Sequence, residues 1–232
     1  MNVTMIFEKL HAHLSALIGG AEPVTIIGIS GNMGAGKSYF GREFSKFLDK
    51  YGIHAVYWDQ DWYQVSRAER EQTLHRLKIE GILDPLELSR RTFFDTYLWE
   101  EMSHHLTCMK SRQNIALSKV YNKSTGERDM PIELSFSKEN KPMWIIYDGG
   151  FIMHKPIRSF MDCLIVVESN TEHRFERMVA RALSLEKPYH YSRTRFNELD
   201  TFISWYLENH RAKTDIILDN NDLIHPEIQF PR

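Results

Sequence analysis

Gly-Asn-Met-Gly-Ala-Gly-Lys-Ser, residues 31–38, is the most informative segment of this 232-residue sequence. It fits the pattern G-x-x-x-x-G-K-(S/T). Residues 24–30 before it form a short β-branched run, which is typical of a buried parallel strand. Residues 40–51 after it carry Phe40, Phe44 and Phe47 at helical spacing. A chance glycine-rich turn usually lacks both neighbours, so we interpret residues 31–38 as a phosphate-binding loop.

The residue types in this loop suit the binding of a nucleotide with its metal ion. Glycines allow the backbone to curl so that successive N–H groups point inward, and the helix that follows directs its positive end to the same place. Lys37 supplies a mobile charge for the β- and γ-phosphates, and the Ser38 hydroxyl is a Mg²⁺ ligand. The predicted ATP-binding residues are Gly31, Asn32, Met33, Gly34, Ala35, Gly36, Lys37 and Ser38. The motif alone does not separate a kinase from an ATPase, a GTPase or a nucleotide-dependent switch.

Strand and helix patterns alternate along the rest of the chain. Further strands are predicted at residues 54–58, 143–147, 163–167 and 215–218. Helices are predicted at residues 5–18, 66–80, 86–109 (one long helix or two), 171–185 and 196–209. This alternation predicts an α/β protein with the three-layer P-loop NTP hydrolase fold and a parallel sheet. We expect one domain over residues 1–232, with a polar insertion at about residues 112–142 and a lid at about residues 182–196.

Composition narrows the class of protein. The chain is 42% hydrophobic and 26% charged, as in an ordinary globular protein, and its formal net charge of −2 favours neither nucleic acid nor an anionic membrane. No apolar run approaches the roughly 20 residues that cross a bilayer. Cys108 and Cys163 have no metal-ligand spacing, so both are expected to be reduced thiols. We expect a cytoplasmic protein without a membrane or nucleic-acid partner; a homo-oligomer is compatible with the sequence, which leaves the oligomeric state open.

Acidic residues follow two of the predicted strands. Asp59 and Asp61 come after the second strand, where a carboxylate could orient an acceptor hydroxyl, although helix capping explains them equally well. Asp148 closes the third strand at a position that suits Mg²⁺, often through water. An Asp-Gly turn is the alternative for Asp148, but the nearby phosphate loop favours magnesium.

Arginines gather in the last third of the chain. Arg174, Arg177 and Arg181 share one helix face, and Arg193 and Arg195 follow a loop that contains Pro and Tyr. Phosphoryl transfer spreads negative charge over equatorial oxygens, which mobile arginines on a lid can stabilise. A solvated basic face is the usual meaning of such a run, so we expect only one or two of the five to act on ATP.

The order of these parts resembles the uridine kinase and phosphoribulokinase family of P-loop kinases over roughly residues 24–218. Beside the phosphate loop, the resemblance rests on four segments. These are Asp61-Trp62-Tyr63, similar to an Asp-x-aromatic segment; Phe94-Asp95, similar to Ala-Phe-Asp; Tyr121 with Arg128 seven positions later; and Asp148-Gly149-Gly150, similar to Glu-Gly. Residues 174–181 also look like the family's arginine helix before the lid.

The resemblance implies a role for each matching residue. Asp61 would be the catalytic carboxylate, with Lys37 and Arg181 acting on the transferring phosphoryl group. Arg177 and Arg193 would contact ATP, and Tyr121 and Arg128 would line the acceptor pocket. Apart from the resemblance, Trp62, Tyr63 and Phe94 could stack on a flat substrate, although core packing is the more frequent fate of Trp and Phe. Of the three, Tyr63 is the residue that we expect to touch the substrate. Ser38 and Asp148 would hold Mg²⁺.

The chain also departs from the family pattern. Asp148 stands where many members have Glu, and Gly126 stands where nucleoside-specific members have His. Asp84 and Asp95 are weaker pocket candidates that could as well be helix-surface residues. The predicted function is ATP- and Mg²⁺-dependent phosphorylation of a hydroxyl on a small metabolite, uridine kinase-like. The alternatives are a kinase for a sugar or a vitamin precursor, and a nucleotide-dependent regulatory ATPase.

Overall fold

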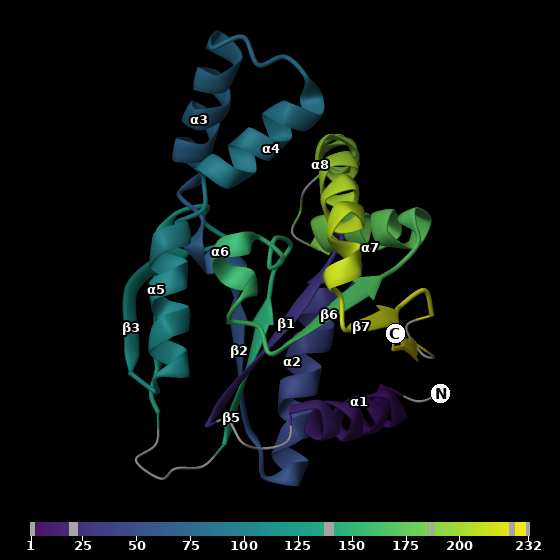
Figure 1. Ribbon diagram of the computed structural model, residues 1–232. Helices are drawn as coiled ribbons and strands as arrows, with labels where there is room; N and C mark the ends of the chain where they lie inside the picture. The colour runs from purple at the N-terminus through teal and green to yellow at the C-terminus, as the bar shows by residue number, and fades with distance from the viewer. Residues whose placement is uncertain are drawn as a thin grey trace. The chain divides into compact units, whose positions relative to one another are not determined.

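The computed structural model describes residues 3–18, 23–136, 142–184, 186, 188–222 and 226–230, without the side chains of residues 191, 192 and 195. The chain divides into two compact units, and Figure 1 labels most of their helices and strands. Unit 1 consists of Met1–Asp59 and Glu139–Arg232, and unit 2 consists of Gln60–Lys138. Unit 2 is therefore larger than the polar insertion expected at residues 112–142. That the chain behaves as one domain stays a prediction.

Unit 1 is an α/β unit built around one sheet. Its elements are α1 (Val3–Ile18), β1 (Val24–Gly31), α2 (Lys37–Leu48), η1 (Asp49–Tyr51), β2 (His54–Asp59), β5 (Met143–Asp148), α6 (Lys155–Arg158), β6 (Cys163–Glu168), α7 (Thr171–Ser184), α8 (Tyr189–His210), η3 (Arg211–Lys213), β7 (Ile216–Asp219) and β8 (Glu227–Gln229).

The sheet has the strand order β2-β5-β1-β6-β7-β8. The first five strands pair in parallel, and β8 pairs antiparallel with β7. The prediction of an α/β fold with a parallel sheet is thus confirmed for the five predicted strands, and the antiparallel edge strand was not predicted. Because parallel strands end at the same edge, the carboxyl ends of β1, β2, β5 and β6 lie together and place the phosphate loop there.

Helices α1 and α2 cover one face of this sheet. Alternate strand residues such as Ile27 and Ile29 point to this face, where they belong to one buried core cluster with both helices. Phe7 of α1 packs on three phenylalanines of α2, with ring centroids 5.2 Å from Phe40, 5.5 Å from Phe44 and 5.3 Å from Phe47. The amphipathic pattern that predicted α2 therefore marks the face that it buries.

The other face of the strands packs against the residues that flank α6, and α8 in turn packs on this segment. A methyl group at Gly28 of β1 would lie 3.0 Å from Ile152 and 3.2 Å from both Leu164 and Met161, so this glycine permits close packing. The Phe151 ring stacks on Phe202 of α8, with centroids 5.6 Å apart. Unit 1 is therefore layered as helix, sheet and helix.

Unit 2 combines three α-helices with a β-hairpin. Its elements are η2 (Gln60–Tyr63), α3 (Arg67–Ile79), α4 (Pro85–Asp95), α5 (Trp99–Lys110), β3 (Ile115–Tyr121) and β4 (Arg128–Leu134). Two helix starts have clear local causes. Ser66 and Glu69 form a capping box at α3. At α4, the Asp84 side chain accepts a hydrogen bond from the backbone N–H of Glu87, and Pro85 occupies the first turn.

Of the two alternatives for residues 86–109, the structure confirms two helices, with the break at residues 96–98. Two other expectations about secondary structure need correction. The polar stretch 112–142 contains the hairpin of β3 and β4. Residues 189–196, expected in the lid, already belong to α8. The predicted end of the first helix at residues 19–20, residues 137–141 of the insertion, and residues 185 and 187 of the lid lie outside the described residues.

Two further observations complete the fold. Cys108 and Cys163 are both buried, and neither forms a disulfide. Among the described residues, no helix combines the length and the apolar character that a membrane span requires.

Replacing Phe44 by Ala should destabilise the protein by about 3–5 kcal/mol, because the ring is fully buried between α1 and the sheet and its loss leaves a cavity. The free energy of unfolding from urea denaturation measures the change. Tyr39→Ala on the same helix is the matched control, since its side chain is 65% exposed. Equal stabilities of the two variants would contradict the assignment of this core.

Candidate active site: two sets of functional residues

The phosphate loop connects β1 to α2 in a conformation that requires glycine. Gly31, Gly34 and Gly36 have φ angles of 149°, 73° and 101°. A Cβ atom at Gly31 would lie 2.3 Å from the carbonyl oxygen of Val167, and one at Gly34 would lie 2.3 Å from the carbonyl oxygen of Arg174. Backbone conformation and close packing therefore both exclude a side chain at these positions.

Asn220 and Arg177 hold the loop from outside. The Asn220 amide donates a 2.7 Å hydrogen bond to the Ala35 carbonyl oxygen. Arg177 donates to the Asn220 carbonyl oxygen at 2.8 Å and to the Gly34 and Ala35 carbonyl oxygens at 3.4 Å each. Since the C=O and N–H of a trans peptide point in opposite directions, these contacts direct the loop N–H groups away from Arg177. Burial lowers the pKa of Arg177 from its usual value.

The remaining loop side chains have mixed surroundings. The Lys37 ammonium donates to the Asn32 carbonyl oxygen at 3.0 Å, and the Asn32 amide donates to Ser204 of α8 at 3.1 Å. Lys37 is thus held across the loop in which it is expected to meet the β- and γ-phosphates. Met33 is half-buried, and Ala35 is buried.

The predicted arginines occupy different environments. Arg174 is 3% exposed and forms an ion pair with Asp200, so it joins α7 to α8. Arg177 binds loop carbonyl groups, as described above. Arg181 on α7 and Arg193 on α8 are exposed, and neither forms an ion pair with a residue that the structure describes. Arg181 and Arg193 are therefore accessible to a phosphate, and that role stays a prediction; the side chain of Arg195 lies outside the described part of the chain.

Asp148 has an arrangement that fits a metal ligand. Its side chain is 2% exposed, and Oδ2 accepts a 2.6 Å hydrogen bond from the Tyr57 hydroxyl on the neighbouring strand β2. Oδ1 is buried without a hydrogen-bond partner among the described residues. A buried carboxylate oxygen with an open coordination position suits Mg²⁺, which typically binds one or two carboxylates together with nucleotide phosphates.

Tyr57 connects the two predicted magnesium ligands. Burial, followed by the charges of Asp148 and Asp59, raises the pKa of Tyr57 far above its ordinary value, while a hydrogen bond with Ser38 opposes the rise. The phenol is therefore neutral and able to donate to Asp148. Asp59 is 4% exposed and lies next to Asp148 in the sheet register. Ser38 and Asp148 are the residues that would hold a Mg²⁺ ion here, and the ion would neutralise charge on the phosphates of ATP.

Asp61 belongs to unit 2 and is held by neutral and cationic donors. Its Oδ1 accepts hydrogen bonds from the Tyr97 hydroxyl at 2.6 Å and from the Gln64 amide at 2.9 Å. Its Oδ2 lies 2.9 Å from the Lys123 ammonium. The side chain is 31% exposed, so an oriented carboxylate remains accessible to a ligand. Such a group can accept the proton of an acceptor hydroxyl.

The predicted acceptor-pocket residues Tyr121 and Arg128 lie in the same unit. The buried Tyr121 hydroxyl accepts from Arg70 at 2.6 Å, and Arg70 also donates to Gln64 Oε1 at 2.8 Å. Arg128 donates to the Gln64 carbonyl oxygen at 3.3 Å and contacts the Glu101 carboxylate at 3.5 Å. Asp61, Gln64, Tyr97 and Lys123 form one cluster, which we call the Asp61 cluster. Through Gln64, both Tyr121 and Arg128 are linked to it.

Tyr63 differs from the prediction that it touches the substrate. Its side chain is 1% exposed, and its hydroxyl lies 3.1 Å from His105 Nδ1. Burial also lowers the pKa of His105. The structure therefore places Tyr63 in the core of unit 2, because the 3-10 helix η2 turns this side chain inward.

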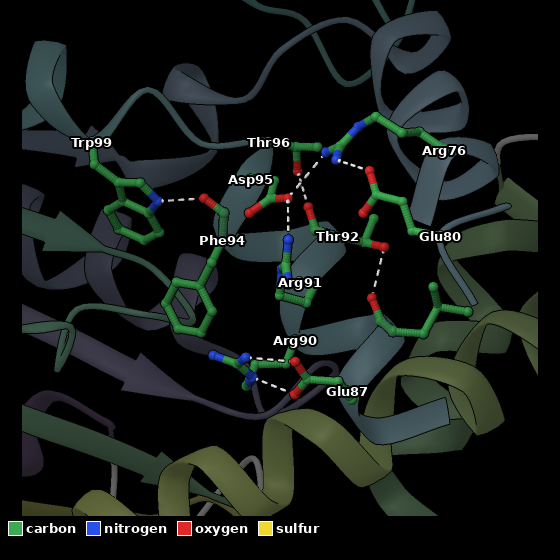
Figure 2. Close-up of polar contacts among 11 residues, drawn as sticks. Arg76, Glu80, Glu87, Arg90, Arg91, Thr92, Phe94, Asp95, Thr96 and Trp99 are labelled. Atoms are coloured by element: carbon green, nitrogen blue, oxygen red, sulfur yellow. Dashed lines mark hydrogen bonds and ion pairs between the residues drawn. The ribbon is translucent and has the colours of Figure 1, made fainter. Parts of the chain in front are cut away.

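The two weaker acidic candidates have helix-surface roles. Asp84 is the N-cap of α4. Figure 2 shows Asp95 at the end of α4 between Arg76 and Arg91, at distances of 3.2 Å and 3.7 Å. The Phe94 ring packs against Trp99, with centroids 5.7 Å apart. None of these three residues belongs to the Asp61 cluster.

Sequence reasoning missed four residues that complete these arrangements: Tyr57, Gln64, Arg70 and Asn220. Tyr57 reads as an ordinary strand aromatic, and the two polar residues of unit 2 fall in a segment without a motif. Asn220 follows the last predicted strand by two residues. A strand-end polar residue was the one available signal, since ligands bind at the carboxyl ends of parallel strands.

Unit 1 is a P-loop nucleotide-binding unit, because a strand, a glycine-rich phosphate loop and a helix N-terminus follow one another in it. The phosphoribulokinase / uridine kinase family model matches residues 26–186, which is more than half of the chain. The chain therefore belongs to this family of P-loop kinases, as the resemblance predicted.

Solved structures with similar folds include three kinases or possible kinases. D-glycerate 3-kinase from Cryptococcus neoformans var. grubii superposes with a TM-score of 0.69 at 13% identity, covering 98% of this chain and 99% of the kinase. A protein named as a possible uridine kinase from Bacillus stearothermophilus gives 0.64 at 17% identity, covering 93% and 96%. Phosphoribulokinase from Rhodobacter spheroides gives 0.59 at 14% identity, covering 90% and 80%. At these low identities, the superpositions show a shared fold and nothing more. No curated protein sequence matches the chain.

Replacing Tyr57 by Phe should lower the free energy of unfolding by about 1–3 kcal/mol, because the Asp148 carboxylate then loses its buried donor. Urea denaturation without nucleotide measures this loss. Tyr39→Phe is the control, since that side chain is 65% exposed. Unchanged stability of Tyr57→Phe would show that the hydrogen bond to Asp148 contributes nothing.

Proposed function

We propose that the protein transfers the γ-phosphoryl group of ATP to a hydroxyl group of a small metabolite. One observation carries this beyond nucleotide binding: the Asp61 carboxylate is oriented by hydrogen bonds from Tyr97 and Gln64 and stays partly exposed. A protein that only binds or slowly hydrolyses ATP has no need for a carboxylate fixed in this way. Membership of a kinase family supports the same conclusion.

The reaction divides its tasks between two sets of residues. In unit 1, Lys37 and the loop N–H groups bind the phosphates, and Ser38 and Asp148 would hold Mg²⁺, which would neutralise charge on the phosphate oxygens. In unit 2, Asp61 orients the acceptor hydroxyl. The acceptor oxygen forms the new bond to phosphorus, the bond to the oxygen that ADP retains breaks, and the hydroxyl proton passes to Asp61.

Other predicted residues support these steps. Arg181 and Arg193 are exposed cations that could stabilise the charge of the transferring group, in the manner of lid arginines. Tyr121 and Arg128 support the surroundings of Asp61 through Arg70 and Gln64. Arg177 instead acts on ATP through the loop carbonyl groups that it holds.

The candidate acceptors are nucleosides, sugars, vitamin precursors and small acids. A regulatory ATPase is the alternative of another class. ATP consumption with and without a metabolite panel separates the two, because a kinase releases ADP only as fast as its acceptor is phosphorylated. Slow release of ADP that no metabolite stimulates would favour the regulatory ATPase.

Replacing Lys37 by Ala should abolish the rise in melting temperature that ATP–Mg²⁺ causes, since the loop loses its charge for the β- and γ-phosphates. Differential scanning fluorimetry measures this shift. Lys46→Ala is the matched control, because Lys46 lies on the exposed side of the same helix, where it pairs with Glu43. An undiminished shift in Lys37→Ala would refute the phosphate-loop assignment.

Replacing Asp61 by Asn should leave ATP binding intact and reduce phosphoryl transfer by about 10²- to 10⁴-fold, because the amide keeps the shape and loses the basic oxygen. ADP release with the acceptor identified from the panel gives the rate. Asp95→Asn, at the surface of α4, serves as the control and should keep the wild-type rate. Full activity of Asp61→Asn would make Asp61 the wrong carboxylate.

A further inference from the structure

Cationic side chains surround the hairpin turn next to Asp61. Arg67 and Arg70 are three residues apart on α3 and so share one helix face, and Lys123 lies in the turn between β3 and β4. The backbone N–H of Arg67 donates a 2.7 Å hydrogen bond to the Gly126 carbonyl oxygen, which fixes the start of α3 against this turn. Unit 2 thus gathers three positive charges at this turn; Lys123 contacts the candidate catalytic carboxylate directly, and Arg70 is linked to it through Gln64.

Arg70 is a partly buried guanidinium with only neutral partners. It donates to Gln64 Oε1 at 2.8 Å, to the Val65 carbonyl oxygen at 2.9 Å and to the Tyr121 hydroxyl at 2.6 Å. Within the described parts of the chain it forms no ion pair. Withdrawing a charge from water without a counter-ion costs free energy, which a bound anion would offset.

Other arginines of unit 2 show the contrast. Figure 2 shows Arg76 bound to Glu80, Arg90 bound to Glu87 and Arg91 bound to Asp95. Arg128 likewise contacts a carboxylate, that of Glu101. These arginines are already neutralised by the protein, so the unneutralised charge of Arg70 lies specifically beside the Asp61 cluster.

The Arg67 guanidinium occupies the space above Gly126. A Cβ atom at Gly126 would lie 2.7 Å from both Cζ and Nη2 of Arg67, and the glycine φ angle is 83°. Any side chain at this position would therefore displace the guanidinium. Because Gly126 has no side chain, the Arg67 guanidinium can lie at the turn as a second cation. Arg67 is exposed and therefore able to meet a ligand.

Lys123 forms an ion pair with Asp61, the carboxylate that we expect to orient the acceptor hydroxyl. Its ammonium lies 2.9 Å from Asp61 Oδ2, and the pair is partly exposed, with Lys123 39% exposed. An exposed ion pair contributes little to stability, so exchange of the partner is inexpensive. An anionic group on the acceptor could take the ammonium and leave Oδ2 open to the acceptor hydroxyl.

We infer that the acceptor is an anion: a small molecule that carries an oxyanion group, carboxylate or phosphate, close to the hydroxyl that is phosphorylated. Lys123, with Arg67 and Arg70, binds the oxyanion while Asp61 takes the hydroxyl. Charge-assisted hydrogen bonds from Lys and Arg are the strong interactions by which proteins recognise both kinds of oxyanion. The inference rests on the proposed kinase function and adds the charge of its substrate.

Matched pairs of compounds test the charge requirement. The pairs are glycerate and glycerol, gluconate and sorbitol, and ribose 5-phosphate and ribose, with uridine as a neutral nucleoside. ADP release at saturating ATP–Mg²⁺ should respond to an anionic member and at least about tenfold less to its neutral counterpart. The glycerate and gluconate arms distinguish a carboxylate from the phosphate of ribose 5-phosphate.

A variant of the cationic set tests the assigned residue. Lys123→Gln should raise the KM for the anionic acceptor by about 10- to 100-fold and change kcat less, because it removes binding of the oxyanion and keeps Asp61. Lys119→Gln, at an exposed position of the same hairpin, should keep the wild-type KM. Equal loss in both variants, or a loss confined to kcat, would overturn the assignment.

The outcomes separate the inference from the function on which it rests. If a neutral compound drives ADP release as well as its anionic partner, the kinase function stands and the inference fails. If no compound drives ADP release, the proposed function fails for this panel, and isothermal titration calorimetry with ADP–Mg²⁺ present decides the inference. Acids that do not bind the wild type, or that bind Lys123→Gln equally well, would refute it.

Discussion

The contact between the phosphate loop and the end of β7 is the constraint on which the nucleotide half of the molecule depends. The Asn220 amide binds the Ala35 carbonyl oxygen, and Arg177 binds the Asn220 carbonyl oxygen together with those of Gly34 and Ala35. Strand β7, helix α7 and the loop are therefore joined by polar groups that are largely shielded from water. Without the Asn220 donor the buried Ala35 carbonyl oxygen would lose its hydrogen bond, at a cost of about 1–3 kcal/mol.

A second constraint lies at the neighbouring strands β2 and β5. Parallel pairing of β2 with β5 brings Asp59 opposite Asp148, two carboxylates that would repel each other without compensation. The Tyr57 hydroxyl donates to Asp148, and a Mg²⁺ ion at Ser38 and Asp148 would add positive charge. The sheet register thus places two carboxylates side by side at the edge of the sheet where we expect the cation.

Much of unit 1 could be predicted because its signals are local. The loop pattern, the β-branched strands and the phenylalanine face of α2 each depend on neighbouring residues. The hairpin of unit 2 was missed because the polar composition of the segment suggested turns, although Ile115 and Leu117 occupy alternate positions and are both buried. Tyr57, Asn220 and Arg70 were not found because their partners are distant in the sequence. Tyr63 was assigned to the substrate, but the turn of η2 buries it.

The close approach of Gly34 to α7 limits how this protein can vary in evolution. A Cβ atom at Gly34 would meet the backbone oxygen of Arg174, 2.3 Å away, rather than a side chain. A clash between two side chains can be relieved by a compensating substitution in the partner, whereas a clash with a backbone oxygen cannot, because every amino acid carries that oxygen. Divergent relatives that retain this packing of α7 should therefore keep glycine here even when Arg174 itself is replaced.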